Sequence, residues 1–202
     1  MIQRLLTAGF ALAVLVPVAA TATATTATAD VPKPLPIGCK FAGSGNALKW
    51  QDATRSAPYA NAAASAVTAW NSTSSQFNMA KVTSGANIRV SDGNFGATWM
   101  GYQFSGIMLG IDQSPTVSCT GGTWDTGRVA WWNTHYTDGY TTDKRKAIMV
   151  HELGHALGLA HTEGRGCEFG IMDTNIDAKY DTACGGFSTP RQADINGAND
   201  LY

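Results

Sequence analysis

The residues from His151 to His161 constrain this chain more than any other stretch, because they read H-E-x-x-H-x-x-G-x-x-H. On a helix, residues four apart lie on one face, so His151 and His155 can present two imidazoles to one metal ion. Gly158 lets the chain leave the helix sharply, since glycine accepts the left-handed conformation found at helix C-termini. His161 can then return as the third ligand. Three nitrogen ligands leave a fourth, open position, which is typical of a catalytic zinc rather than a structural one.

Glu152 follows the first histidine and lies about 100° around the helix from it. It can therefore reach a metal-bound water without binding the metal, which predicts the role of general base. The helix is supported independently by an apolar face opposite the histidines, formed by Met149, Val150, Leu153, Ala156 and Leu157. Thr141, Thr142 and Asp143 are the N-cap candidates, so we expect a helix over 143–158.

With Met172 in Gly170-Ile171-Met172-Asp173, the histidine motif resembles the metzincin clan of zinc endopeptidases, whose signature adds a methionine turn beneath the zinc. Further stretches resemble the matrixin branch, specifically small secreted bacterial matrixin-like proteases: Leu48–Trp50, Ala62–Trp70, Gly106–Gly110 and Asp194–Gly197. The resemblance implies that Met172 packs under the metal without binding it. It also implies that an edge strand binds the substrate through Ile107, Met108, Leu109 and Gly110.

The resemblance implies an α+β metzincin (zincin-like) fold. This is a twisted, mixed five-stranded sheet with two long helices and a small C-terminal subdomain that ends in a third helix. Sequence patterns predict strands at 47–51, 78–82, 87–91, 107–111 and 129–136. They predict helices at 59–71, 143–158 and 190–201, with Pro190 in the first turn of the last one. Glycine-rich linkers are expected at 92–101 and 121–127, and the tail after the zinc motif is expected to hold one helix.

The N-terminus has the pattern of a secretory signal peptide. Arg4 precedes an apolar run over residues 5–20, and Ala27-Thr28-Ala29 is an A-x-A cleavage site. We therefore expect a signal peptide at 1–29, one metalloprotease catalytic domain at 30–202, and a secreted, extracellular protein. The 14 Lys and Arg against 15 Asp and Glu exclude a strongly basic surface, so neither nucleic acid nor a membrane is an expected partner. We expect a monomer that acts on protein or peptide substrates.

Four cysteines in an exported chain favour two disulfides, for which three pairings exist. Local loop closure favours Cys167–Cys184, which would enclose Met172 and leave Cys39–Cys119. An alternative is that Cys39 is a latency thiolate on the zinc, as in matrixin pro-segments, although the Arg-Cys-Gly core of that switch is missing.

One catalytic zinc ion is the expected cofactor. Calcium is possible through the loop aspartates Asp92, Asp112, Asp125 or Asp138, but no specific motif supports it. His135, the one histidine outside the motif, is expected at a surface strand end, so a second zinc is not expected. Tyr180 is a candidate for stabilising an oxyanion, with a surface tyrosine as the simpler interpretation.

These features together predict a secreted zinc-dependent endopeptidase. It would hydrolyse internal peptide bonds of extended or unfolded proteins by a metal-activated water, with Glu152 as general base. Two alternatives remain open: a zinc hydrolase of a non-protein amide such as a cell-wall crosslink, and an inactive secreted zinc-binding module. The intact Glu152 disfavours the inactive module, because a pure binding site has no use for the base.

Overall fold

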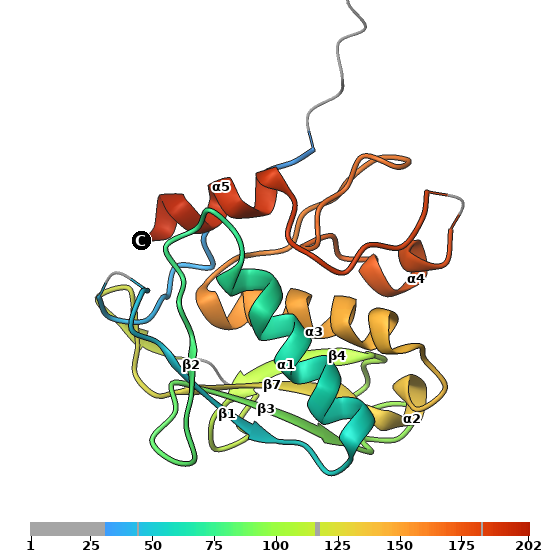
Figure 1. The fold of residues 1–202 in the computed structure, drawn as a ribbon, viewed down its shortest axis with the longest axis horizontal. Helices are drawn as coiled ribbons and strands as arrows, with labels where there is room; N and C mark the ends of the chain where they lie inside the picture. Colours follow the sequence, from blue (N-terminus) through green and yellow to red (C-terminus); the bar gives the residue numbers. More distant parts are fainter. Residues whose placement is uncertain (1–30, 44, 116–117, 183) are drawn as a thin grey trace, which may run out of the picture.

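The computed structural model describes residues 31–43, 45–115, 118–182 and 184–202 (Figure 1). The predicted signal peptide at 1–29 lies outside these residues. In the part of the chain that is described, no helix is long and apolar enough to cross a membrane.

The central element is a five-stranded mixed sheet in the order β2-β1-β3-β7-β4, as expected. Its strands are β1 Lys49–Ala53, β2 Ala80–Lys81, β3 Ile88–Gly93, β4 Gly106–Gly110 and β7 Arg128–Asn133. The first three pairings are parallel, whereas β4 runs antiparallel to β7 and forms one edge of the sheet. β4 therefore has a free edge, which is where the sequence predicts substrate binding.

Two long helices, α1 Ala57–Asn71 and α3 Thr142–Leu157, cover one face of this sheet, as Figure 1 shows. Four buried alanines of α1 let the two helices approach closely. Indole N–H groups join the layers: Trp70 of α1 donates to the Val150 carbonyl at 2.9 Å, and Trp132 of β7 donates to the Arg145 carbonyl at 3.0 Å. Both carbonyls belong to α3, so α3 is fixed from two sides.

The C-terminal part lies on the far side of α3 from the sheet and contains α4 Ile176–Tyr180 and α5 Gln192–Leu201 (Figure 1). The predicted subdomain that ends in a helix is thus present. The prediction of a tail with one helix is wrong, because α4 also forms there. α5 begins after Arg191, so Pro190 precedes the helix instead of lying in its first turn.

The predicted strand at 129–136 is too long. The Asn133 side chain accepts a hydrogen bond from the His135 backbone N–H at 3.2 Å, which starts the short helix α2 Thr134–Thr137. The expected linker at 121–127 contains part of a hairpin, formed by β5 Cys119–Thr120 and β6 Thr123–Trp124. The other linker starts later than expected, because β3 continues to Gly93.

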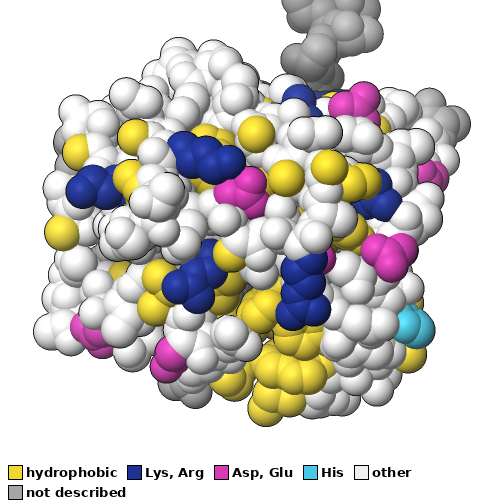
Figure 2. Space-filling model, turned by 60° about the horizontal axis from the view of Figure 1, so that its bottom comes forward, with side chains coloured by type: hydrophobic (Ala, Val, Ile, Leu, Met, Phe, Trp, Pro, Cys, Tyr) yellow, Lys and Arg dark blue, Asp and Glu magenta, His cyan; other side chains and the backbone are white. Residues whose placement is uncertain are grey.

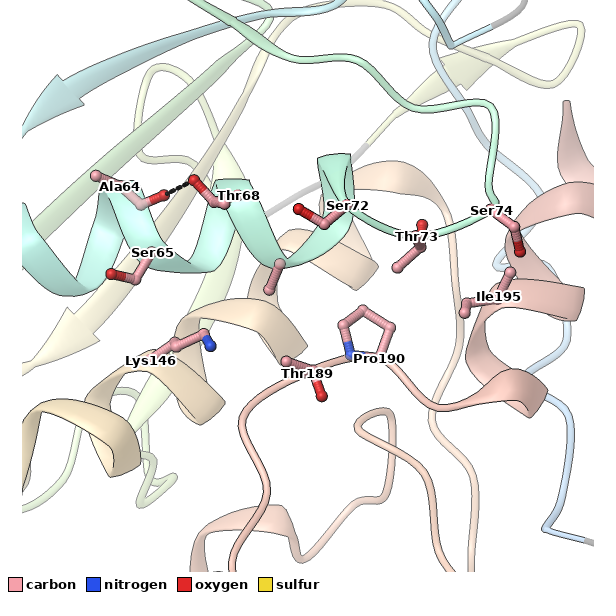
Figure 3. Close-up of a pocket in the computed structure, with 11 residues that line it drawn as sticks. Ala64, Ser65, Thr68, Ser72, Thr73, Ser74, Lys146, Thr189, Pro190 and Ile195 are labelled. Atoms are coloured by element: carbon pink, nitrogen blue, oxygen red, sulfur yellow. Dashed lines mark hydrogen bonds between the residues drawn. The ribbon is translucent and has the colours of Figure 1, made fainter.

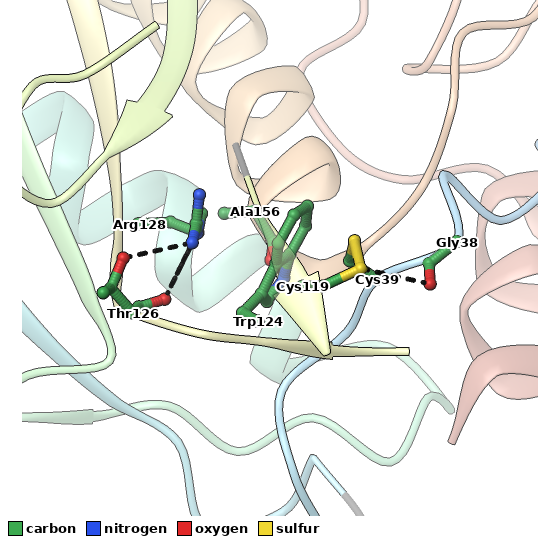
Figure 4. Close-up of a disulfide and its surroundings, with 7 residues drawn as sticks. All are labelled: Gly38, Cys39, Cys119, Trp124, Thr126, Arg128 and Ala156. Atoms are coloured by element: carbon green, nitrogen blue, oxygen red, sulfur yellow. Dashed lines mark hydrogen bonds between the residues drawn. A yellow bond between two sulfur atoms is a disulfide. The ribbon is translucent and has the colours of Figure 1, made fainter. Parts of the chain in front are cut away.

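The structure contains two disulfides, Cys39–Cys119 and Cys167–Cys184, and no free cysteine among the described residues. Figure 4 shows that Cys39–Cys119 joins the N-terminal segment to the β5–β6 hairpin. Beside it, the Trp124 indole donates to the Ala156 carbonyl of α3 at 3.0 Å. The alternative of Cys39 as a latency thiolate is therefore wrong in this structure.

Candidate metal centre

Helix α3 and the turn after it bring together the three histidines of the motif. The Nε2 atoms of His151 and His155 lie 3.0 Å apart, and they lie 3.2 Å and 2.9 Å from Nε2 of His161. Within the described residues, these histidines are the one group of three or more His, Cys, Asp or Glu side chains that is close enough to share a metal ion.

Backbone carbonyls set the tautomers of two of these rings. The Ile171 carbonyl lies 2.7 Å from Nδ1 of His151, and the Leu159 carbonyl lies 2.7 Å from Nδ1 of His155. A carbonyl can only accept, so each Nδ1 carries the hydrogen and each Nε2 presents a lone pair. Lone pairs that face one another at about 3 Å repel unless a cation lies among them. The donor set therefore fits a zinc ion.

Burial favours the neutral form of the His151 and His155 imidazoles. It is the main cause that lowers the pKa of His151 well below its ordinary value and lowers the pKa of His155 to about 4. Burial also lowers the pKa of His161, although the nearby Asp173 carboxylate acts in the opposite direction. Neutral imidazole is the form that binds a metal, so these side chains do not have to lose a proton before they bind one at neutral pH.

The turn that carries His161 is held by the N-terminal segment. Gly158 has φ of 110°, and a side chain there would also overlap the Cys39 carbonyl, so both backbone conformation and space require glycine. The Ile37 N–H donates to the Gly158 carbonyl, and the Ala160 N–H donates to the Leu35 carbonyl, each at 2.8 Å. A short antiparallel pairing therefore sets the path of the chain towards His161.

Glu152 lies next to the histidines and is 5% exposed. Burial raises the pKa of its carboxyl to about 8, and a cation among the histidines would favour the charged form. A strand residue, Gly106 of β4, packs directly on it: a Cβ at Gly106 would lie 2.6 Å from Oε1 of Glu152 and 2.6 Å from Cγ2 of Ile148. The sequence analysis placed Gly106 in the edge strand but did not predict its contact with Glu152, although a glycine inside a strand often marks such a close approach.

Met172 is fully buried beneath α3, where a Cβ at Gly154 would overlap its sulfur. The Asp194 carboxylate of α5 accepts the backbone N–H groups of Ile171 at 2.9 Å and Met172 at 3.3 Å. The methionine turn thus has a fixed position, and it supplies the Ile171 carbonyl that orients His151.

A cleft of about 720 Å³ runs past Glu152, His151 and His161. The segment before β4 and the segment from Thr174 to Ala178 line its two sides. The members of the first side are Tyr102, Gln103, Phe104, Ser105 and Gly106. The predicted substrate contact at 107–110 concerns the backbone of β4. The side chains of Ile107 and Leu109 belong to an apolar cluster on the other face of the sheet, and Met108 packs against the core.

The second side of the cleft is the start of α4, which a buried lysine fixes to α3. Nζ of Lys144 lies 2.8 Å from Oδ1 of Asp177 and 2.5 Å from Oδ2 of Asp181. The Tyr140 hydroxyl donates to Oδ2 of Asp177 at 2.9 Å. Since Lys144 is in the first turn of α3, the helix that carries the histidines also positions this wall.

The remaining candidates lie away from the cleft. His135 is exposed on α2, and Tyr180 packs against Gly186. Among the described residues, the four aspartates named as calcium candidates do not come together in one group; Oδ1 of Asp92, in β3, accepts from the distant Arg55 N–H at 2.7 Å. Figure 3 shows a separate pocket of about 680 Å³ between α1 and the start of α5, which is lined by hydroxyl groups and Lys146 and contains none of the predicted site residues.

One comparison with known proteins, a match to a sequence profile, identifies the family of this chain. No curated protein sequence matches the chain. Among solved structures, the crystal structure of myroilysin aligns with a TM-score of 0.49 and 17% identity, over 87% of this chain and 92% of that chain. The sequence profile described as Matrixin matches residues 46–202, which include the sheet, both long helices and the three histidines. The chain therefore belongs to the matrixin family of metalloproteases.

Proposed function

We propose that this protein is a secreted zinc-dependent endopeptidase that cuts internal peptide bonds of extended or unfolded proteins. One observation carries the proposal. The Glu152 carboxyl is buried beside the three converging Nε2 atoms, on a cleft that is also lined by Gly106, the first residue of the edge strand β4.

His151, His155 and His161 would hold the zinc through Nε2. When bound, zinc supplies a Lewis acid that polarises a carbonyl and lowers the pKa of water towards about 7. The chain supplies the orientation of the ligands, because the Ile171 and Leu159 carbonyls fix two of the rings.

Glu152 would move the proton. Its carboxylate would take a proton from the attacking water and pass it to the nitrogen of the departing amine. Gly106 and Ile148 pack against this side chain and restrict where its oxygens can lie. One buried carboxyl would thus serve first as base and then as acid.

β4 would bind the substrate. An extended peptide can add to a free sheet edge through backbone hydrogen bonds, which requires several residues in an extended conformation. Compact native domains do not offer such segments, so unfolded proteins would be the better substrates.

Secretion is part of the proposal. The A-x-A pattern that ends at Ala29 supports it, and so do two disulfides, which persist in oxidising compartments.

Digestion of unfolded casein by the purified, zinc-loaded protein, followed by mass mapping of the cut sites, tests the proposal. We expect internal cuts that stop with a zinc chelator and return on adding zinc. Glu152→Ala is expected to keep its zinc and lose at least ~10²-fold in rate, the scale of a lost general base. Trimming from chain ends only would make the protein an exopeptidase. No cleavage would favour the non-protein amide or the inactive zinc-binding module.

A further inference from the structure

A second pocket, of about 300 Å³, lies on the face of the sheet that the long helices leave uncovered. We call it the arginine pocket; it is lined by Gln51, Ala53, Arg55, Arg89, Ser91, Gln113, Val129 and Trp131. The parallel register explains the grouping, since Gln51, Arg89 and Val129 lie side by side, as do Ala53, Ser91 and Trp131. Figure 2 shows the molecule from this side, with Lys and Arg side chains bordering an apolar patch.

The pocket carries positive charge that nothing in its lining neutralises. Among the described residues, neither the Arg55 nor the Arg89 guanidinium has a hydrogen bond or ion pair. The lining contains no carboxylate. Two guanidinium groups offer a fork of N–H donors that matches carboxylate, sulfate or phosphate oxygens.

A buried donor in the same pocket also lacks an acceptor. Trp131 is 8% exposed, and its Nε1 has no hydrogen-bond partner among the described residues. The nitrogen edge of this indole lies over Gly93, where a Cβ would be 3.4 Å from Nε1. β3, which contains Gly93, lies between Trp131 on β7 and β1, and Arg55 follows the end of β1. The indole nitrogen thus lies above β3, next to the strand that leads to Arg55, and an oxygen acceptor placed there would offset the cost of the unmade hydrogen bond.

Gln113 adds a conformational observation. Its φ is 69°, in the left-handed region, and its N–H donates to the Gly110 carbonyl at 2.7 Å in a tight turn. Such a conformation is uncommon for a residue with a side chain and is found most often where function requires it. Here the turn brings a side-chain amide to the rim of the pocket.

We propose that the arginine pocket is a binding site for an oxyanion group, a sulfate, phosphate or carboxylate. Arg55, Arg89 and the Trp131 indole would supply the donors. The site lies on the opposite face of the sheet from α3 and its histidines, so it does not depend on the proposed proteolysis. A ligand that carries such a group could stay bound here while the cleft is free for a substrate.

The test uses the zinc-loaded, ¹⁵N-labelled protein and follows its tryptophan indole N–H resonances by NMR. The sequence has 6 tryptophans, and the indoles of Trp70, Trp124 and Trp132 already donate to backbone carbonyls. Sodium sulfate, phosphate and acetate are titrated against chloride at constant ionic strength, because simple screening would otherwise mimic binding. Trp131→Phe assigns the Trp131 resonance by its disappearance.

We expect a saturable shift of the Trp131 resonance. Arg55→Gln or Arg89→Gln is expected to lower the affinity for the anion by about tenfold. Arg165→Gln, which removes an exposed arginine outside the pocket, should leave the affinity unchanged. Tighter binding of sulfate or phosphate would indicate a ligand with a tetrahedral oxyanion, and tighter binding of acetate would indicate a carboxylate. An unmoved Trp131 resonance with all three anions, or equal weakening by Arg165→Gln, would overturn the proposal. If Arg89→Gln fails to fold, the exposed Arg55 still carries the test.

Discussion

Adding one methyl group to β4, by Gly106→Ala, is expected to disable catalysis without removing the metal. The new Cβ would lie 2.6 Å from both Oε1 of Glu152 and Cγ2 of Ile148. Ordinary van der Waals contact begins at 3.4 Å, so the carboxylate must move by about 0.8 Å or the strand must move away. Misplacing a catalytic group by about 1 Å costs on the order of 10²-fold in rate. The cost in stability should be about 1–3 kcal/mol, the range for overpacking a core.

The assay is kcat/KM on unfolded casein, with zinc content and thermal unfolding measured on the same sample. Gly139→Ala is the matched control, because a Cβ there meets nothing within 4 Å and the backbone needs no positive φ. In a protein that already carries Glu152→Ala, Gly106→Ala should lower kcat/KM little further, since both changes remove the function of the same carboxylate. If Gly106→Ala keeps activity within threefold of wild type at full zinc occupancy, the idea that Gly106 positions Glu152 for catalysis is refuted.

Further predictions concern the metal, the disulfide and the C-terminus. His161→Ala should lose zinc, and full occupancy measured by metal analysis would contradict the three-ligand site. Replacing both Cys167 and Cys184 by serine should lower the free energy of unfolding by about 3 kcal/mol, the loop-closure term for a crosslink of this span. Peptide mapping that joins Cys39 to either of them would contradict the pairing. Burial raises the pKa of Tyr202 to about 12 in the folded state, against about 10 in the unfolded chain, so ionisation of the unfolded chain should lower stability by up to about 3 kcal/mol as pH rises from 10 to 12. In Tyr202→Phe, the loss of stability in alkaline denaturation curves should be smaller, and an unchanged slope would count against this assignment.

The part of the site that local sequence determines was predictable. Helix α3, its Thr141 N-cap and its Gly158 C-cap follow from residue type and periodicity, and they place His151 and His155 on one face. The mixed sheet and the two long helices also agree with the prediction.

The remaining features depend on contacts between residues far apart in the sequence. Nothing near Gly106 shows that Glu152 will pack against it. Helix α4 has only five residues and no side-chain N-cap, and it forms where Lys144 and Tyr140 of distant elements hold Asp177. Short helices of this kind take their stability from tertiary contacts, which a periodic pattern does not reveal.

The antiparallel pairing between the Leu35–Ile37 segment and the Gly158–Ala160 turn bears on the order in which the parts of the metal centre are assembled during synthesis. This segment is made early, whereas Asp194, which holds the methionine turn beneath the histidines, is made near the end of the chain. A nascent chain that stops before α5 contains all three histidines but lacks the carboxylate that fixes the Ile171 carbonyl behind His151. Such long-range contacts form late in folding. An incomplete chain of this kind carries the whole histidine motif without the finished centre.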